Sequence, residues 1–177
     1  MIETERLRLR VPGAAARATL HGWYADPRVM ADLGPVMDEA AADATIARHH
    51  GYRAEGLGFW LVERKQDSAP IGYCGLKPGN PLTPLAGELE IGWLFDPTYW
   101  GQGYASEAAA ASLTWAWANR AERRVVAITA RLNPKSQRVM ERIGMHAKPA
   151  LDFEHPNFPE GDRLRDSVVY VIDRPAT

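Results

Sequence analysis

A glycine-rich turn between a strand pattern and a long helix pattern constrains the fold more than any other feature of the sequence. Residues 100–106 read Trp-Gly-Gln-Gly-Tyr-Ala-Ser. The stretch 88–95 before them alternates like a strand, and the alanine-rich stretch 104–119 after them predicts a helix. Glycines let successive backbone N–H groups turn toward one point, and a helix N-terminus adds about half a positive charge there. The turn therefore predicts a nest for a phosphate or pyrophosphate group that needs no lysine.

Two better-known phosphate-binding loops fit these residues poorly. A P-loop ends in Gly-Lys-Ser/Thr, and no lysine follows these glycines. A dinucleotide-binding fingerprint needs a third glycine where Ser106 stands, within an early strand–helix–strand unit, and this turn lies past the middle of the chain. For a motif this short, a plain strand-to-helix turn without a ligand remains the alternative.

The patterns on either side of the turn predict a mixed α/β domain that covers residues 1–177. We expect irregular loops at 77–87, which is rich in proline and glycine, and at 152–165. Strands are expected at the N-terminus up to Arg10 and at 57–63, 71–76, 88–95, 125–130 and 167–172, and helices at 14–25, 38–55, 104–119 and 133–144.

Composition and charge exclude several classes of protein. The 177 residues are 46% hydrophobic and 24% charged with a formal net charge of -1, so we expect no nucleic-acid partner. Cys74 is the single cysteine, which excludes an intrachain disulfide. The apolar stretches are too short to span a membrane and no cationic leader precedes them, so we expect a cytoplasmic protein without a membrane partner.

Two stretches together resemble a known family. Residues 90–108, Glu-Ile-Gly-Trp-Leu-Phe-Asp-Pro-Thr-Tyr-Trp-Gly-Gln-Gly-Tyr-Ala-Ser-Glu-Ala, resemble the acetyl-CoA loop of the GNAT superfamily, and more narrowly of its ribosomal-protein N-terminal acetyltransferase branch. Residues 133–145, Asn-Pro-Lys-Ser-Gln-Arg-Val-Met-Glu-Arg-Ile-Gly-Met, resemble the family's second signature. Trp100 stands where most members carry Arg or Gln. The opening strand and the order of elements agree over nearly the whole chain.

The resemblance implies an N-acetyltransferase with acetyl-CoA as cosubstrate. It implies a single domain with a central mixed, mostly antiparallel sheet of about six to seven strands flanked by about four helices. A primary amine, either a protein N-terminus or a small molecule, would attack the thioester directly in a ternary complex. A non-catalytic acyl-CoA-binding regulatory module, or a donor with a longer acyl chain, remains an alternative. Similar proteins are commonly homodimers.

By the same resemblance, the pantetheine arm would run along the end of the strand 88–95, and the pyrophosphate would bind amides of the turn. The N–H of Leu94 or a neighbour would stabilise the oxyanion of the tetrahedral intermediate. The expected acetyl-CoA site comprises Trp93, Leu94, Phe95, Trp100, Gly101, Gln102, Gly103, Tyr104, Ala105, Ser106, Asn133 and Ser136.

Three residues are candidates for catalysis. The resemblance implies that Ser136 would protonate or stabilise the leaving thiolate, and the alternative is a serine bonded back to its own helix. Glu90 occupies the strand position where several GNAT enzymes place the base, and Glu88 is the second candidate. A base is needed because amines are mostly protonated at neutral pH and then cannot attack a thioester. The alternative for both glutamates is an ion-paired or solvated side chain on a strand.

Other reactive side chains point to structural roles. Cys74 lies among Ile71, Tyr73 and Leu76, so we expect a buried structural thiol rather than a nucleophile. The five histidines show no spacing typical of metal ligands, and no metal is expected. The family resemblance implies that acceptor contacts would come from residues near 23–38, 77–87 and 152–165. The late loop carries a set of acidic residues that would attract a cationic amine or simply face solvent, namely Asp152, Glu154, Glu160 and Asp162.

Overall fold

One mixed sheet organises the chain in the computed structural model, which describes residues 1–176. Its strand order is β1-β2-β3-β4-β5-β6-β9-β7, and β8 pairs separately with β9. All pairs are antiparallel except β5 with β6. The strands are β1 (Ile2–Glu3), β2 (Leu7–Arg10), β3 (Gly58–Arg64), β4 (Pro70–Pro78), β5 (Leu89–Phe95), β6 (Arg124–Ala130), β7 (His146–Ala147), β8 (Phe153–Glu154) and β9 (Asp166–Asp173).

The predicted mixed, mostly antiparallel sheet is confirmed, with nine strands within residues 1–176 instead of six or seven. Three of the nine strands, β1, β7 and β8, have two residues each. A two-residue strand has no alternation to read, because the period of a strand is itself two residues. Such strands exist only because a longer neighbour supplies hydrogen-bond partners.

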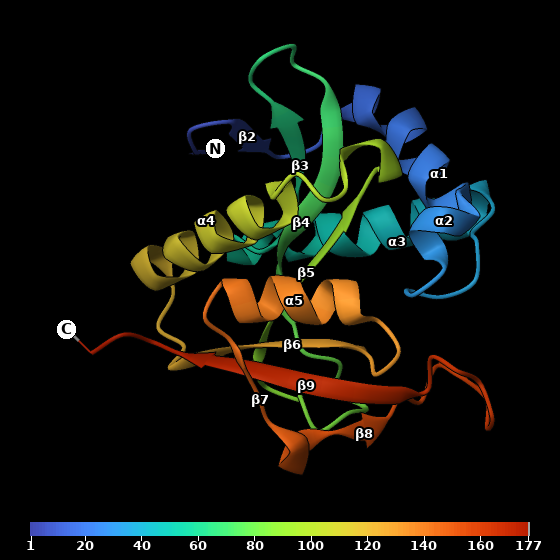
Figure 1. Cartoon of the computed structure of the whole chain (residues 1–177). Coiled ribbons are helices and arrows are strands. Elements are labelled where there is room, and N and C mark those ends of the chain that lie inside the picture. Colours follow the sequence, from blue (N-terminus) through green and yellow to red (C-terminus); the bar gives the residue numbers. More distant parts are fainter. Residues whose placement is uncertain (177) are drawn as a thin grey trace.

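Five α-helices cover the two faces of the sheet, with α4 and α5 in front of it and α3 behind it in Figure 1. The prediction counted four helices and missed α2, where Asp26 ends one helix and its side chain then accepts a hydrogen bond from the Arg28 N–H to begin the next. No helix within residues 1–176 is long and apolar enough to cross a membrane. The helices are α1 (Arg17–Ala25), α2 (Pro27–Met30), α3 (Glu39–Gly51), α4 (Tyr104–Asn119) and α5 (Pro134–Arg142).

Alternation along β5 divides the core into layers. Leu89 and Ile91 pack with α4 and α5 on one face of the sheet, whereas Leu94 packs with α1, α2 and α3 on the other. The two faces of this one strand therefore look toward different sets of helices, because successive side chains of a strand point to opposite sides.

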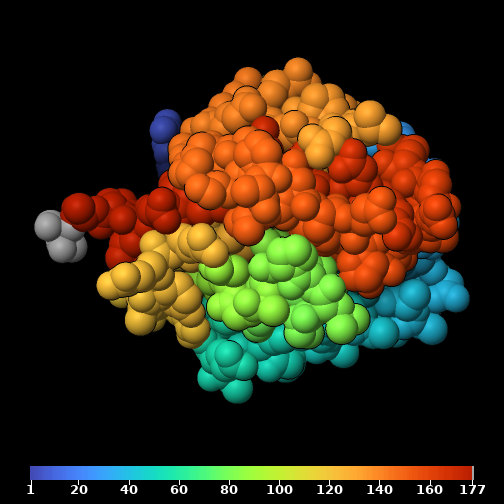
Figure 2. Space-filling view, turned by 90° about the horizontal axis from the view of Figure 1, so that it is seen from below, coloured from blue at the N-terminus to red at the C-terminus, as the bar shows by residue number. Residues whose placement is uncertain are grey.

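The loop between β4 and β5 also contributes to the core, although the sequence predicted an irregular surface loop there. Leu85 is fully buried against Val126, Val169 and Val171 of β6 and β9. Figure 2 shows this loop in light green, bordered by the orange and red C-terminal segments and by the teal region of α3. Proline and glycine content identified the absence of regular structure but not the buried leucine.

The sheet opens between its two parallel strands. Pairing between β5 and β6 comprises Leu89 with Val125 and Glu90 with Val126. Beyond Glu90, β5 continues to Phe95 without a β6 partner in the described part of the chain. This opening positions the functional site.

Candidate active site

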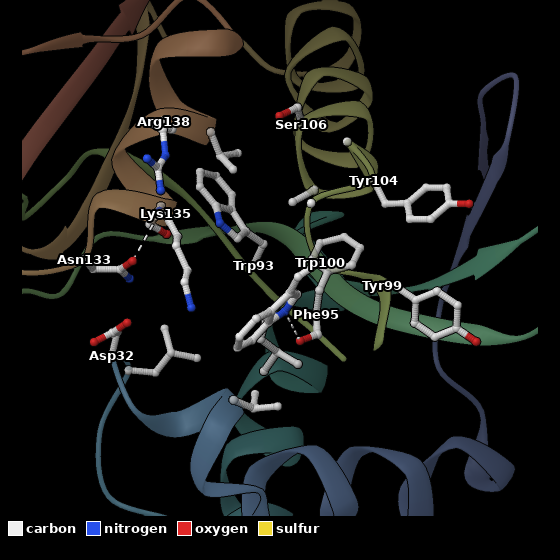
Figure 3. Close-up of a pocket in the computed structure, with 18 of the residues that line it drawn as sticks. Asp32, Trp93, Phe95, Tyr99, Trp100, Tyr104, Ser106, Asn133, Lys135 and Arg138 are labelled. Atoms are coloured by element: carbon white, nitrogen blue, oxygen red, sulfur yellow. Dashed lines mark hydrogen bonds between the residues drawn. The ribbon is translucent and has the colours of Figure 1, made fainter. Parts of the chain in front are cut away.

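A cleft of about 290 Å³ lies next to the opening between β5 and β6. The end of β5, the glycine turn, the first turns of α4 and α5, and the α2 segment line it (Figure 3). Its lining includes eleven of the twelve residues predicted to bind acetyl-CoA: Trp93, Leu94, Phe95, Trp100, Gly101, Gly103, Tyr104, Ala105, Ser106, Asn133 and Ser136.

The glycine turn has the backbone geometry of an anion-binding nest. Gly101 and Gly103 have φ angles of 75° and 84°, a left-handed conformation that glycine adopts without strain. The backbone N–H groups of residues 101–106 form no backbone hydrogen bonds within residues 1–176, and the first bond of the α4 ladder runs from the Glu107 N–H to the Gly103 carbonyl at 3.0 Å. The Ser106 hydroxyl is buried and also lacks a partner. These free donors fit a pyrophosphate group.

Residues on the outer side of the turn brace it. Arg6 donates to the Gln102 carbonyl at 3.1 Å and forms an ion pair with Glu107 at 2.6 Å. Thr4 donates its hydroxyl proton to Glu107 at 2.5 Å. Because these contacts come from the turn between β1 and β2 and from the first turn of α4, they orient the glycine turn without occupying its free N–H groups.

Gln102 is the one predicted acetyl-CoA contact that does not line the cleft. Its side-chain amide donates to the Thr98 carbonyl at 3.1 Å, and its backbone carbonyl accepts from Arg6. The side chain therefore stabilises the turn from outside. Only its backbone N–H remains for a ligand.

Trp100, the departure from the family pattern, connects the turn to the end of β5. Its indole N–H donates to the Phe95 carbonyl at 2.8 Å. Lys135 of α5 places its Nζ 4.4 Å from the centre of the indole ring. Trp100 thus holds the positive charge of Lys135 at the cleft. An arginine at position 100 would carry such a charge itself.

The α5 side of the cleft is set by Asn133, which is 5% exposed. Its side chain accepts from the Ser136 N–H at 3.1 Å, as an N-cap does, and donates to the Thr129 hydroxyl at 2.9 Å. The Ser136 hydroxyl lines the cleft and forms no hydrogen bond with its own helix, whereas Ser112 of α4 donates back to the Ala108 carbonyl at 2.8 Å. Within the described residues, the alternative of a back-bonded Ser136 is therefore not observed.

The structure adds lining residues that the sequence reasoning missed. Lys135, Arg138 and Arg142 of α5 make one wall of the cleft basic. Their spacing of three and four residues is the signal that would have placed them on one face of the helix. Arg28, Val29, Asp32 and Leu33 line the opposite wall. No sequence pattern would have found this second group, because a four-residue helix has too few turns to show a period.

Neither of the two glutamates predicted as the general base lines the cleft. Glu90 is 5% exposed, points to the face of β5 opposite Trp93, and pairs with Lys77 of β4 at 2.5 Å. Glu88 precedes β5 and accepts from the Arg124 Nε at 2.9 Å. The Arg124 guanidinium lowers the pKa of Glu88 below its usual value. The ion-paired alternative thus describes the contacts of both glutamates.

Three of the four acidic residues of the late loop are engaged away from the cleft, and the fourth, Glu160, is exposed and does not line it. Asp152 pairs with Arg131 at 3.1 Å, Glu154 pairs with Arg165 at 2.8 Å, and Asp162 accepts from the Leu164 N–H at 2.8 Å. None of these carboxylates lines the cleft. They do not form the acidic rim that the sequence allowed as one of two alternatives.

The expectation of a buried thiol is confirmed. Cys74 is fully buried with its Sγ 3.7 Å from the Ser112 hydroxyl, and burial raises the pKa of the thiol to about 12. At neutral pH it is not a thiolate and has no access to a substrate. Within residues 1–176, no group of three or more His, Cys, Asp and Glu side chains could hold a metal ion.

A split sheet with a nest of free N–H groups at a helix N-terminus and basic side chains on the facing helix defines a protein class that binds a phosphate-bearing ligand. The model of the acetyltransferase (GNAT) domain matches residues 6–146. The chain therefore belongs to the GNAT acetyltransferase family. It is an acyl-CoA-dependent N-acetyltransferase with acetyl-CoA as its cosubstrate.

The similarity to known proteins extends over nearly the whole chain. An uncharacterized N-acetyltransferase of Bacillus subtilis, YnaD, is 39% identical over 174 residues, which are 97% of this chain and 95% of YnaD. A crystal structure of an acetyltransferase from Agrobacterium tumefaciens has 28% identity and a TM-score of 0.79, with 97% and 92% of the two chains covered. RimL, a ribosomal L7/L12 alpha-N-protein acetyltransferase in complex with coenzyme A, shares the fold at 18% identity and a TM-score of 0.77, with 96% and 95% covered.

Proposed function

We propose that this protein transfers an acetyl group from acetyl-CoA to a primary amine by direct attack in a ternary complex. One observation carries the proposal: residues 101 and 103–106, whose backbone N–H groups are free, line the same cleft as Ser136, whose hydroxyl is unbonded. The acceptor is either a small-molecule amine or a protein N-terminus, and RimL is an example of the second kind in this fold.

The donor side uses the nest and the open edge of β5. The pyrophosphate binds amides of the turn, and Lys135, Arg138 and Arg142 supply positive charge toward the donor's phosphates. The pantetheine arm lies along the part of β5 that has no β6 partner and bonds to its backbone as an added strand would. Ser136 donates its hydroxyl proton to the sulfur that leaves as the amine attacks.

The base in this proposal is Glu90. It occupies the last position at which β5 pairs with β6, next to the opening of the sheet, and its carboxylate looks toward the face that carries α1 and α3. An acceptor that enters from that face would lose its proton to Glu90 through a water molecule, since Glu90 does not line the donor cleft. Glu88 is the poorer candidate because Arg124 lowers its pKa and so its basicity.

The test is the release of free thiol from acetyl-CoA in the presence of spermidine and of peptides with varied N-termini. We expect Ser136→Ala and Glu90→Gln each to lower kcat by about 10²-fold or more at unchanged acetyl-CoA affinity, which is the usual contribution of a proton-transfer group. Gly103→Val should instead weaken acetyl-CoA binding, because valine is strained at a φ of 84°. Gly87→Val, at a φ of 82° outside the cleft, is the matched control for strain alone.

Initial rates at varied concentrations of both substrates test the ternary complex. We expect intersecting double-reciprocal lines, and mass spectrometry should find no acetyl group bound to the protein after incubation with acetyl-CoA. Parallel lines with an acetylated protein would exclude direct attack. Binding of acetyl-CoA without thiol release for any amine would replace the proposal with a non-catalytic acyl-CoA-binding module.

A further inference from the structure

Asp32 is the one carboxylate among the described residues that line the cleft. It follows α2 and lies between Val29 and Leu33, which line the same wall. Figure 3 shows its carboxylate below Asn133 and Lys135, on the α2 side of the cleft, with Ser106 on the α4 side. The wall that carries Asp32 thus faces the α5 wall across the cleft.

The two walls differ in charge: the α2 wall carries Asp32 together with Arg28, whose guanidinium is already paired with the N-cap carboxylate of α2 at 2.6 Å. Acetyl-CoA is a polyanion, and the α5 wall carries Lys135, Arg138 and Arg142. A carboxylate in the same cleft would repel the phosphates and therefore adds nothing to donor binding. The acceptor, in contrast, arrives as an ammonium ion at neutral pH because free amines have pKa values of about 8 to 10.

The surroundings of Asp32 leave room for a second cation. Its Oδ1 accepts from Arg163 of the late loop at 3.0 Å, and the side chain is 28% exposed. Arg163 also donates to the Ala31 carbonyl. Oδ2 forms no hydrogen bond with any residue of the described chain, so one oxygen remains available. Arg163 itself is half exposed, and such pairs are weak enough to exchange.

We propose that Asp32 binds the ammonium group of the acceptor at the mouth of the cleft and that Arg163 is the competing cation in its absence. This inference rests on the proposed function, since it assigns the acceptor side of the same site. It makes Asp32 a specificity-determining residue: a cationic amine gains a charge-assisted hydrogen bond there, and an anionic molecule is repelled.

The proposal predicts that removing the negative charge of Asp32 and removing the positive charge of Arg163 have opposite effects on the KM of the amine. With saturating acetyl-CoA, and with spermidine and a peptide with an N-terminal serine as probes, Asp32→Asn should raise the KM of the amine about 10-fold or more and change kcat less than about threefold, as expected for the loss of one charged contact. Arg163→Gln should lower the KM, because it removes the competitor. Glu160→Gln, an exposed acid of the late loop outside the cleft, is the control and should change neither value.

Binding measurements separate this inference from the proposed function. Calorimetry should show equal acetyl-CoA affinity in the wild type, Asp32→Asn and Arg163→Gln, and weaker binding of the amine probe to the CoA-loaded Asp32→Asn protein. If the probe binds through Asp32 but no thiol is released, the inference stands and the catalytic proposal fails. The inference would be overturned if the probe bound equally well to wild type and Asp32→Asn, or if it did not bind to the wild type. It would also be overturned if Asp32→Asn and Arg163→Gln raised the KM alike, because that result indicates a purely structural ion pair.

Discussion

At the scale of single residues, His49 shows what burial does to a titratable group in this protein. The side chain is 5% exposed, its ring centre lies 4.2 Å from that of Phe59, and its Nδ1 has no hydrogen-bond partner. Burial is the main cause that lowers the pKa of His49 to about 3, and the positive charges of Arg48, Lys77 and Arg53 contribute to the same shift in that order. The imidazole is therefore neutral in the folded protein over the whole physiological range.

This depressed pKa predicts a loss of stability in mild acid. The unfolded chain binds a proton at His49 near pH 6.5 and the folded protein does so only near pH 3, so stability is present above pH 6.5 and falls as the pH decreases between these values. Between pH 7 and pH 5, urea denaturation should show a decrease of about 2 kcal/mol from this residue. His49→Leu should lose most of that dependence, while His50→Leu, which changes an exposed neighbour, should keep it. Identical pH dependence in wild type and His49→Leu would contradict the prediction.

At the scale of elements, the N-terminus of α5 links helix stability to the site. Asn133 caps the helix and is tied to β6 through Thr129, and the capped N–H belongs to Ser136. The same side chain therefore begins the helix, attaches it to the sheet and fixes the position of the candidate acid. The sequence predicted the cap, because it joins Asn133 to a residue three positions later in the chain. It did not predict the hydrogen bond to Thr129, because that bond depends on how α5 packs against β6.

Replacement of two helix caps should separate stability from binding. Asn133→Ala removes the cap and leaves the Thr129 hydroxyl without its partner, so the free energy of unfolding should fall by about 1 to 3 kcal/mol, and acetyl-CoA should bind more weakly. Asp38→Ala removes the equivalent bond to the Ala41 N–H of α3, away from the cleft. It should cost about 1 kcal/mol with unchanged acetyl-CoA affinity. Equal effects of both variants on calorimetric affinity would contradict a role of Asn133 in the site.

At the scale of the whole molecule, the opening between β5 and β6 requires support elsewhere in the sheet. Two residue pairs connect these strands, and the loop between β4 and β5 packs Leu85 against β6 and β9. This loop thereby joins the part of the sheet that precedes the opening to the part that follows it. A loop far from the cleft thus contributes to a sheet that can remain open at one end.

Leu85 is accordingly expected to matter for stability and not for ligand binding. Leu85→Ala should lower the free energy of unfolding by about 2 to 5 kcal/mol, the usual range for a fully buried leucine. Leu82→Ala in the same loop is the control, since Leu82 is 76% exposed and should change stability by less than about 0.5 kcal/mol. Urea denaturation gives both values. A loss for Leu85→Ala no larger than that of the control would show that the loop does not stabilise the sheet.

The sequence by itself determined the features that depend on neighbours a few residues apart. The start of α4 at Tyr104, the cap at Asn133 and the left-handed glycine at 144 all match their predictions. Caps, turns and periodic patterns act within one or two turns of the backbone, so the sequence carries them directly. The predicted donor site consists of such features, and eleven of its twelve residues line the cleft.

Only the tertiary structure decided what depends on contacts between distant segments. The pairing of Glu90 with Lys77, the approach of Asp32 to Arg163 and the burial of Leu85 each join residues whose separation along the chain carries no pattern. Which face of β5 meets the cleft, and which side chains compete for a carboxylate, are set by the packing of whole elements. For this reason the glycine turn predicted a donor site from sequence, whereas the residues on the opposite wall of the cleft became visible only in the fold.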